Sequence, residues 1–246
     1  MASTKRPVPE WRALEANSKS DLSGKLSEID ISVPSRGCGR TSLHVEKRCI
    51  CHLLSTLNNN NRLAFPVKVS ESERPDFVIT INGNPSFGVE ITEAIQEDLA
   101  QTMTLPEAQH PEAVIDRSLF RWDDPKKSLG EKRNIASRTR LSGPPWEGDD
   151  PEKECAQAIK DITFTKTEKL NEGDFQRFGE NWLEIYDNVS LAGLEKAEDY
   201  IQSALEPYWR ESSFSHIFDR IFVERERYIM EFSQSSFHLH RLCNLW

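Results

Sequence analysis

Two short segments in which apolar and polar residues alternate predict a β-hairpin. They span residues 74–81 and 86–92, and an Asn-Gly dipeptide typical of tight hairpin turns lies between them. One face of this hairpin is apolar and is formed by Phe77, Ile79, Ile81, Phe87, Val89 and Ile91. We expect helices to cover that face. The opposite face carries two acids, Asp76 and Glu90.

Two amphipathic helices are predicted, over residues 41–58 and 150–171. In the first, one apolar stripe recurs at helical spacing and consists of Leu43, Ile50, Leu53, Leu54 and Leu57. Glu46 lies near the middle of this stripe. A carboxylate on a buried face is costly unless a cation or hydrogen bonds compensate it. In the second helix the stripe is Cys155, Ile159, Ile162 and Leu170, and Lys166 lies close to its centre.

The remaining pattern predicts further strands and one further helix. The strands are expected over residues 62–69, 181–188, 217–224 and 228–233, and the helix over residues 194–210. Helices and strands that alternate in this order are typical of an α/β domain. We therefore expect a central mixed β-sheet that is flanked by helices.

Two regions fall outside this pattern. Residues 1–40 carry prolines, serines and charges, and we expect a poorly ordered N-terminal arm with a short helix around residues 11–16. Residues 98–150 are irregular and predict a partly helical insertion into an α/β domain that spans residues 41–246. Within residues 117–140, eight Lys or Arg stand against three Asp or Glu.

Composition and charge restrict the class of protein. The 246 residues carry a net charge of −9, which argues against a protein that coats nucleic acid by bulk electrostatics. Five unevenly spaced cysteines favour a reducing compartment over a disulfide framework. The polar N-terminus does not have the pattern of a secretion signal, and no apolar run is long enough to span a membrane. We expect a cytoplasmic protein that does not contact membranes.

The two hairpin acids are suited to bind a divalent metal. Asp76 and Glu90 offer carboxylate oxygens on rigid backbone, and Mg²⁺ prefers oxygen ligands and retains several waters. A metal held in this way activates water and stabilises charge on a phosphate. A nearby lysine orients the nucleophile or neutralises the developing anion. Glu46 and Lys166, which lie on other elements, are candidates to complete this site.

At these residues the chain resembles the PD-(D/E)XK nuclease superfamily, whose fold is that of many restriction endonucleases. The family pattern is Pro-Asp at the start of a strand, then an acid, any residue and a lysine on the next strand. The matching positions here are Pro75-Asp76 and Glu90-Ile91-Thr92, with thirteen residues between the acids. The family often adds a glutamate from the preceding helix, and Glu46 is placed for that role. The resemblance covers residues 42–92, and residues 152–188 by the order of elements.

The resemblance implies a function as well as a fold. It implies a restriction endonuclease-like core and a nuclease that depends on Mg²⁺ or Mn²⁺, with Asp76, Glu90 and Glu46 as metal ligands. The expected substrate is nucleic acid, with DNA favoured, and defence against foreign DNA is the role that the resemblance suggests. The local excess of positive charge in residues 117–140 of an acidic chain separately indicates either a contact with nucleic acid or a solvated loop. Because duplex cleavage requires two cuts, a homodimer or a partner subunit is expected by analogy.

One position departs from the family pattern, because Thr92 stands where the lysine is expected. Some members of the superfamily supply this lysine from a neighbouring helix. Lys166 is the best candidate for such a migrated catalytic lysine, and Lys169 and Lys68 are weaker candidates. If none of them reaches the site, the domain is a catalytically inactive module that binds nucleic acid or a partner protein.

Each candidate residue also has a structural alternative. Asp76 could cap a turn, Glu90 could pair with a surface lysine, and Lys166 could extend its amine into water. Glu46 could pair with a neighbouring basic residue of its own helix. Trp122 and Trp146 could stack on unpaired bases or anchor the insertion to the core. An α/β protein in which the acids have only a structural role remains a third hypothesis.

A zinc site is not predicted, although potential ligands cluster near the first helix. These residues are Cys38, His44, Cys49, Cys51 and His52. Their spacing matches no familiar zinc pattern, and a helix places Cys49 and Cys51 on different faces. His238 and His240 would share one face of a strand, where a structural role is more common than metal binding.

Overall fold

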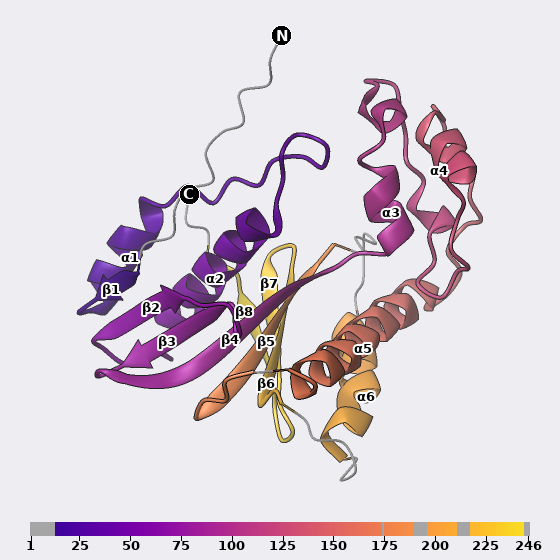
Figure 1. Cartoon of the computed structure of the whole chain (residues 1–246). Coiled ribbons are helices and arrows are strands. Elements are labelled where there is room, and N and C mark those ends of the chain that lie inside the picture. The colour runs from indigo at the N-terminus through magenta and orange to yellow at the C-terminus, as the bar shows by residue number, and fades with distance from the viewer. Residues whose placement is uncertain (1–12, 174, 189–195, 211–216, 244–246) are drawn as a thin grey trace.

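The computed structural model describes residues 13–173, 175–188, 196–210 and 217–243. In these residues one mixed sheet contains eight strands, which follow one another across the sheet in chain order (Figure 1). The pairs β4–β5 and β5–β6 are parallel, and the other neighbours are antiparallel. The strands are β1 (Leu14–Ala16), β2 (Val67–Glu71), β3 (Phe77–Ile81), β4 (Asn84–Ala94), β5 (Glu180–Asp187), β6 (Arg220–Arg225), β7 (Tyr228–Phe232) and β8 (Phe237–Arg241).

Helices cover both faces of the sheet. Helices α1 (Lys19–Ser27) and α2 (Ser42–Asn59) pack on one face, where Leu53 of α2 joins a buried core with Phe77 and Val89. Helices α5 (Asp150–Asn171) and α6 (Ala197–Arg210) pack on the other face, in a core that includes Leu183 and Ile201. The α/β class, with a mixed sheet flanked by helices, is therefore confirmed.

The predicted hairpin is present as β3 and β4. Asn82 and Gly83 connect the two strands with φ values of 52° and 79°, a left-handed conformation that the Asn-Gly dipeptide adopts readily. Its apolar face is covered by α2, as expected: Phe77, Ile79, Val89 and Ile91 are buried, and Ile81 and Phe87 are partly buried against the same core. The polar face of the hairpin is turned toward the α5 side of the sheet.

Several predicted boundaries are displaced. The strand expected over residues 62–69 begins only at Val67, because Pro66 has no N–H to donate to a strand ladder. The last two predicted strands are found at 220–225 and 228–232, and an additional edge strand, β8, follows them. Of the helix expected over 194–210, residues 194 and 195 lie outside the described part of the chain.

The N-terminal region differs from the expected disordered arm. Residues 14–16 form β1, which pairs with β2, so the short helix expected around 11–16 is wrong there. Helix α1 follows, with Ser18 as its N-cap and with Leu22 and Leu26 fully buried. Two apolar residues four positions apart suffice to hold a short helix against α2, but they form too short a pattern to be recognised in the sequence. Residues 1–12 lie outside the described residues.

The expected insertion between β4 and α5 forms a small unit of its own. It contains α3 (Glu97–Thr102), two short 3₁₀ turns (Pro106–Gln109 and Arg117–Leu119) and α4 (Leu129–Ala136). Leu99, Phe120 and Ile135 form a separate small core. Figure 1 shows α3 and α4 beyond the sheet, near the N-terminal end of α5.

Candidate active site

The two hairpin acids lie opposite each other where β3 and β4 begin to separate. The ladder pairs Phe77 with Val89 and Val78 with Gly88, so the next pair in this register is Asp76 and Glu90. Opposed side chains of an antiparallel pair have Cβ atoms about 4.5–5.5 Å apart. The backbone N–H of Ile91 also donates to Asp76 Oδ2 at 2.7 Å. The Asp76 carboxylate is therefore held against β4 beside Glu90.

Lys166 joins this pair from α5. Its Nζ lies 2.7 Å from Glu90 Oε1, and the two side chains are 27% and 6% exposed. Thr163 and Thr167 are buried on α5, where Thr163 donates to the Ile159 carbonyl oxygen of its own helix and Thr167 donates to the Tyr208 hydroxyl of α6. The lysine head is thus supplied to the carboxylates by packing of a helix rather than by the strand that carries Glu90.

Glu46 approaches the same group from α2, on the other side of the sheet. Its carboxylate is half-buried and accepts a hydrogen bond from the Ser42 side chain one turn earlier. It interacts electrostatically with Glu90 and with Lys166. The structure therefore brings Asp76, Glu90 and Lys166 together and leaves Glu46 within electrostatic range of them. The three acids do not form a group whose ligand atoms all lie within 4.8 Å of one another in the described residues, and the catalytic and metal-binding roles stay predictions.

The pKa values of Asp76 and Glu46 are raised first by burial and then by neighbouring negative charge. Burial and the neighbouring Glu90 carboxylate raise the pKa of Asp76 to about 7, against the opposing effect of the Ile91 hydrogen bond. Burial raises the pKa of Glu46 as well, and the carboxylates of Glu71 and Glu90 add to this. Lys166 offsets only part of the charge of three carboxylates. A divalent cation would complete the compensation.

The unused oxygen of Glu90 supports the same conclusion. Among the described residues, Glu90 Oε2 is buried and has no hydrogen-bond partner, although Oε1 is bound by Lys166. An unsatisfied buried carboxylate oxygen is costly. With Asp76 opposite, it forms a pair of oxygen donors of the type that Mg²⁺ or Mn²⁺ binds. Asp76 and Glu90 therefore suit the expected metal as a pair of ligands, whereas Glu46 does not complete a close group of three.

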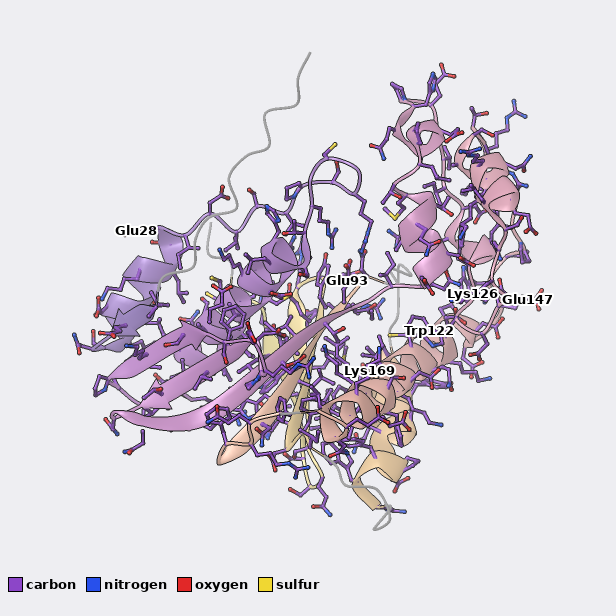
Figure 2. All side chains as sticks on the ribbon, in the orientation of Figure 1. Glu28, Glu93, Trp122, Lys126, Glu147 and Lys169 are labelled. Carbon is purple, nitrogen blue, oxygen red and sulfur yellow. The ribbon has the colours of Figure 1, made fainter. Side chains whose placement is uncertain are left out.

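The position of the missing motif lysine is occupied by a neutral side chain. Thr92 is half-buried on β4 and pairs with Ile185 of β5. Of the weaker lysine candidates, Lys68 forms an ion pair with Glu15 at 2.8 Å, at the β1–β2 edge. Lys169 is exposed on α5, where Figure 2 labels it. Lys166 is the candidate lysine that forms an ion pair with a site carboxylate.

Most basic residues of 117–140 have partners within the insertion and around it. Arg117 donates to the carbonyl oxygen of Asn188, and Lys132 forms a buried ion pair with Asp98 at 2.9 Å. Further contacts involve Arg121 with Trp146, Lys126 with Glu97, Lys127 with Asp124, Arg133 with Glu107, and Arg138 with Asn134 and Ser142. These contacts stabilise the insertion itself. Exposed members such as Lys126, which Figure 2 labels, remain accessible to a ligand.

One of the two tryptophans anchors the insertion to α5. Trp122 Nε1 donates to Asp161 of α5 at 2.9 Å, and its backbone N–H contacts the Glu154 carboxylate. The guanidinium of Arg121 stacks over the Trp146 ring at 3.2 Å from its centroid, a contact within the insertion itself. The contacts of Trp122 favour the anchoring alternative for that residue, and the two alternatives for Trp146 stay predictions.

Two contributors to the site were missed in the sequence. Glu71, at the end of β2, adds negative charge near Glu46, but it lies in a polar run that gives no signal. Gly88 permits the close approach of Pro75, since a Cβ at residue 88 would lie 2.9 Å from the proline ring. A glycine inside a strand pattern is the signal that could have indicated such an approach.

The histidines considered in the sequence have partners within the chain. His44 Nδ1 accepts a hydrogen bond from the Thr41 backbone N–H at the start of α2. His240 pairs with Glu231 at 2.8 Å, in a network that also includes Arg62 and Arg220. His52 contacts Glu224 at 2.8 Å. The contacts of His44 and His240 are structural. The contact of His52 belongs to the group of Cys49, Glu184 and Glu224.

Comparisons with protein-family models, curated proteins and solved structures find no match in any of the three. The class that the structure defines is an α/β protein with a mixed sheet and a carboxylate–lysine cluster at one hairpin. None of the helices in the described ranges combines the length and apolar character needed to cross a membrane.

Proposed function

We propose that this chain is a metal-dependent nuclease with a restriction endonuclease-like core, which hydrolyses phosphodiester bonds in DNA. The observation that carries the proposal is the 2.7 Å contact between Lys166 and Glu90, because it supplies a cation where Thr92 cannot. The opposition of Asp76 and Glu90 in the hairpin register supports it. The basic, exposed members of the insertion provide a surface for the DNA backbone.

Each site residue has a role that follows from its position. Asp76 and Glu90 provide oxygen ligands, and Glu46 completes or tunes the set from α2. A bound Mg²⁺ or Mn²⁺ supplies Lewis-acid stabilisation of the phosphate and a coordinated water of lowered pKa. The Lys166 ammonium orients the attacking water and neutralises charge that develops on the phosphate. Phosphodiester hydrolysis then depends on positioning and electrostatics rather than on a covalent intermediate.

Plasmid cleavage in the presence of Mg²⁺ or Mn²⁺ tests this proposal. The most informative variant is Asp76→Asn, because an amide oxygen can still accept the Ile91 hydrogen bond while the negative charge is lost. We expect cleavage to fall at least about 100-fold. Asp123→Asn, an exposed acid of the insertion, is the matched control and should cut at the wild-type rate. Equal cleavage by wild type and Asp76→Asn would refute the proposal.

The neutral Thr92 favours a second candidate, an inactive module of the same fold that binds nucleic acid or a partner protein. Calorimetric titration with Mg²⁺ and Mn²⁺ separates the two candidates. The nuclease proposal requires metal binding at millimolar concentrations or below, which Asp76→Asn should abolish. Absence of metal binding together with retained DNA binding would establish the inactive module instead.

A further inference from the structure

A second group of potential metal ligands lies on the α2 face of the sheet. It consists of Cys49 of α2, Glu184 of β5 and Glu224 of β6, each offering one donor atom, with all three atoms within 4.8 Å of one another. The side chains are fully or almost fully buried, at 0%, 0% and 2% exposure. Along β5, Leu183 and Ile185 belong to the core on the α5 side, so Glu184 is turned toward α2. This group is separate from Asp76, Glu90 and Lys166.

The carboxylates of this cluster are poorly satisfied by the protein. Within the described chain, both oxygens of Glu184 and Oε2 of Glu224 are buried and have no hydrogen-bond partner. Glu224 Oε1 is bound by His52 Nδ1 at 2.8 Å. Two adjacent carboxylates without solvent repel each other and each incurs a desolvation cost. The cluster therefore requires either bound protons or a bound cation.

The types of donor atom discriminate between cations. A cysteine sulfur is a poor ligand for Mg²⁺ or Ca²⁺, which prefer oxygen, but it binds Zn²⁺ and related borderline metals well. Zn²⁺ also accepts carboxylate oxygens, and three protein ligands leave one position for a water. His52 would not bind the cation itself; it contacts Glu224 at 2.8 Å and so orients that ligand.

A cavity lies beside the cluster. It has a volume of about 700 Å³ and is lined by Arg48 and His52 of α2, by Ile31 of the α1–α2 connection, by Glu226 between β6 and β7 and by Leu242 after β8. Since His52 contacts both this cavity and Glu224, it separates the cavity from the buried ligands. A metal site requires an entry path, and from this cavity that path would lead past His52.

We propose that Cys49, Glu184 and Glu224 bind one Zn²⁺-type divalent cation, with His52 as a positioning residue. The cation would connect α2 to β5 and β6 and would thereby stabilise the helix that carries Glu46. This proposed site does not depend on the proposed nuclease activity. The spacing of cysteines and histidines along the chain does not reveal this proposed site, because its other two ligands, Glu184 and Glu224, lie on strands far from Cys49 in the sequence.

Metal content and Co²⁺ absorption of the full-length protein test the proposal. After chelation and dialysis, one equivalent of Zn²⁺ should bind and raise the melting temperature. Substitution with Co²⁺ should produce the near-ultraviolet charge-transfer band that a thiolate ligand gives. In Cys49→Ser the band should vanish and the Zn²⁺ affinity should fall at least about tenfold. Cys155→Ser, which removes another buried cysteine from α5, should keep both properties.

A second variant protects the test against misfolding. Glu184→Gln preserves side-chain size and removes a buried charge, so it should fold in the absence of metal and lose Zn²⁺ binding. Asp76→Asn should retain one equivalent of Zn²⁺, which separates this site from the nuclease site. A folded wild type that binds no Zn²⁺ and gives no thiolate band would overturn the proposal and assign the cluster to carboxylic acids that share protons.

Discussion

The Lys166 side chain links α5 to the hairpin through one contact, so its removal has two consequences. In Lys166→Met the buried Glu90 carboxylate loses its partner at 2.7 Å, and we expect about 1–2 kcal/mol of destabilisation. Loss of the ammonium from the site should reduce DNA cleavage about 10²–10³-fold. Urea unfolding and plasmid cleavage measure the two effects separately.

The matched control for this substitution is Lys169→Met, one turn further along α5, where the side chain is exposed. It should leave stability and cleavage unchanged. Lys166→Arg keeps a positive charge. Its stability should be close to that of the wild type, but its rate of DNA cleavage should be lower, because the planar guanidinium of arginine differs in geometry from an ammonium. Wild-type cleavage by Lys166→Met would assign this lysine to structure alone.

Asp76 gives the stability of the chain a particular pH dependence. Its pKa is raised from 3.8 to about 7 in the folded chain by burial and by Glu90. Between about pH 4 and pH 7 the folded chain therefore holds a proton that the unfolded chain has released. The contribution of Asp76 to the free energy of unfolding is therefore fully present below this pH range and is lost as the pH rises through it. Thermal unfolding without divalent metal should show this decrease.

The same proton competes with the metal. Below about pH 7, binding of Mg²⁺ must release the Asp76 proton, so the apparent affinity should increase with pH up to that value and then level off. In Asp76→Asn the part of the pH dependence of stability that Asp76 causes should disappear, because the amide does not titrate. Parallel stability profiles of wild type and Asp76→Asn between about pH 4 and pH 8 would contradict the assignment of the shift to this carboxyl.

At the scale of elements, the position of Asp76 depends on the packing of β4 against the residues before β3. A Cβ on Gly88 would lie 2.9 Å from Pro75 Cγ and 2.8 Å from the Phe178 ring. Neither ring can move as the end of a flexible chain does. We expect Gly88→Ala to destabilise the fold by about 1–3 kcal/mol and to displace Pro75, and with it Asp76. Cleavage should fall by more than the unfolded fraction explains.

Gly24→Ala is the control for the loss of a glycine. Gly24 lies inside α1, and a Cβ added there would have no heavy atom within 4 Å, so the methyl group of alanine has space. Alanine is the better helix former, and the variant should gain up to about 1 kcal/mol. If Gly88→Ala proved as stable and as active as Gly24→Ala, the close approach at Pro75 would have no bearing on the site.

The elements that could be predicted are those with a long or strict pattern. The hairpin follows from alternation and the Asn-Gly turn, and α2 and α5 follow from apolar stripes of several turns. Strand β1 and helix α1 are too short for such a signal. Strand β1 is held by its pairing with β2, and α1 by the burial of Leu22 and Leu26. Strand β8 is an edge strand with exposed side chains such as Leu239, so it has no buried period to detect.

The candidate site could be predicted in part for the same reason. The opposition of Asp76 and Glu90 follows from hairpin register, which the local sequence determines. The approach of Lys166 depends on how α5 crosses the sheet after a long insertion, and the sequence alone only places this lysine on a buried stripe. Glu184 and Glu224 lie within apolar strand segments, and only the pairing of β5 with β6 brings them together near Cys49.

At the scale of the whole molecule, the proposed function requires an acidic chain to bind an acidic polymer, which it could do only through a local surface. The net charge of −9 gives no general attraction to DNA. The insertion concentrates positive charge, but many of its basic residues are engaged in internal contacts. Lys126, Arg133 and Arg140 are exposed, so they are the members best placed to contact phosphates.

The triple substitution of Lys126, Arg133 and Arg140 by Gln tests that surface. We expect DNA affinity to fall about tenfold or more, and the slope of log K against log salt to decrease by about 2–3. A control with the same change in net charge replaces Lys19, Lys25 and Lys68, which lie near the β1–β2 edge of the sheet. Filter binding at several salt concentrations measures both variants.

The comparison between the two triple variants decides where the DNA lies. If only the insertion variant weakens binding, the insertion holds the polymer while Asp76, Glu90 and Lys166 act on the phosphate. Equal weakening by both variants would show that net charge alone controls binding. If the insertion variant binds DNA as tightly as the wild type, the basic residues of the insertion have only a structural role. The ion pair between Lys132 and Asp98, which joins α4 to α3, is an example of that role.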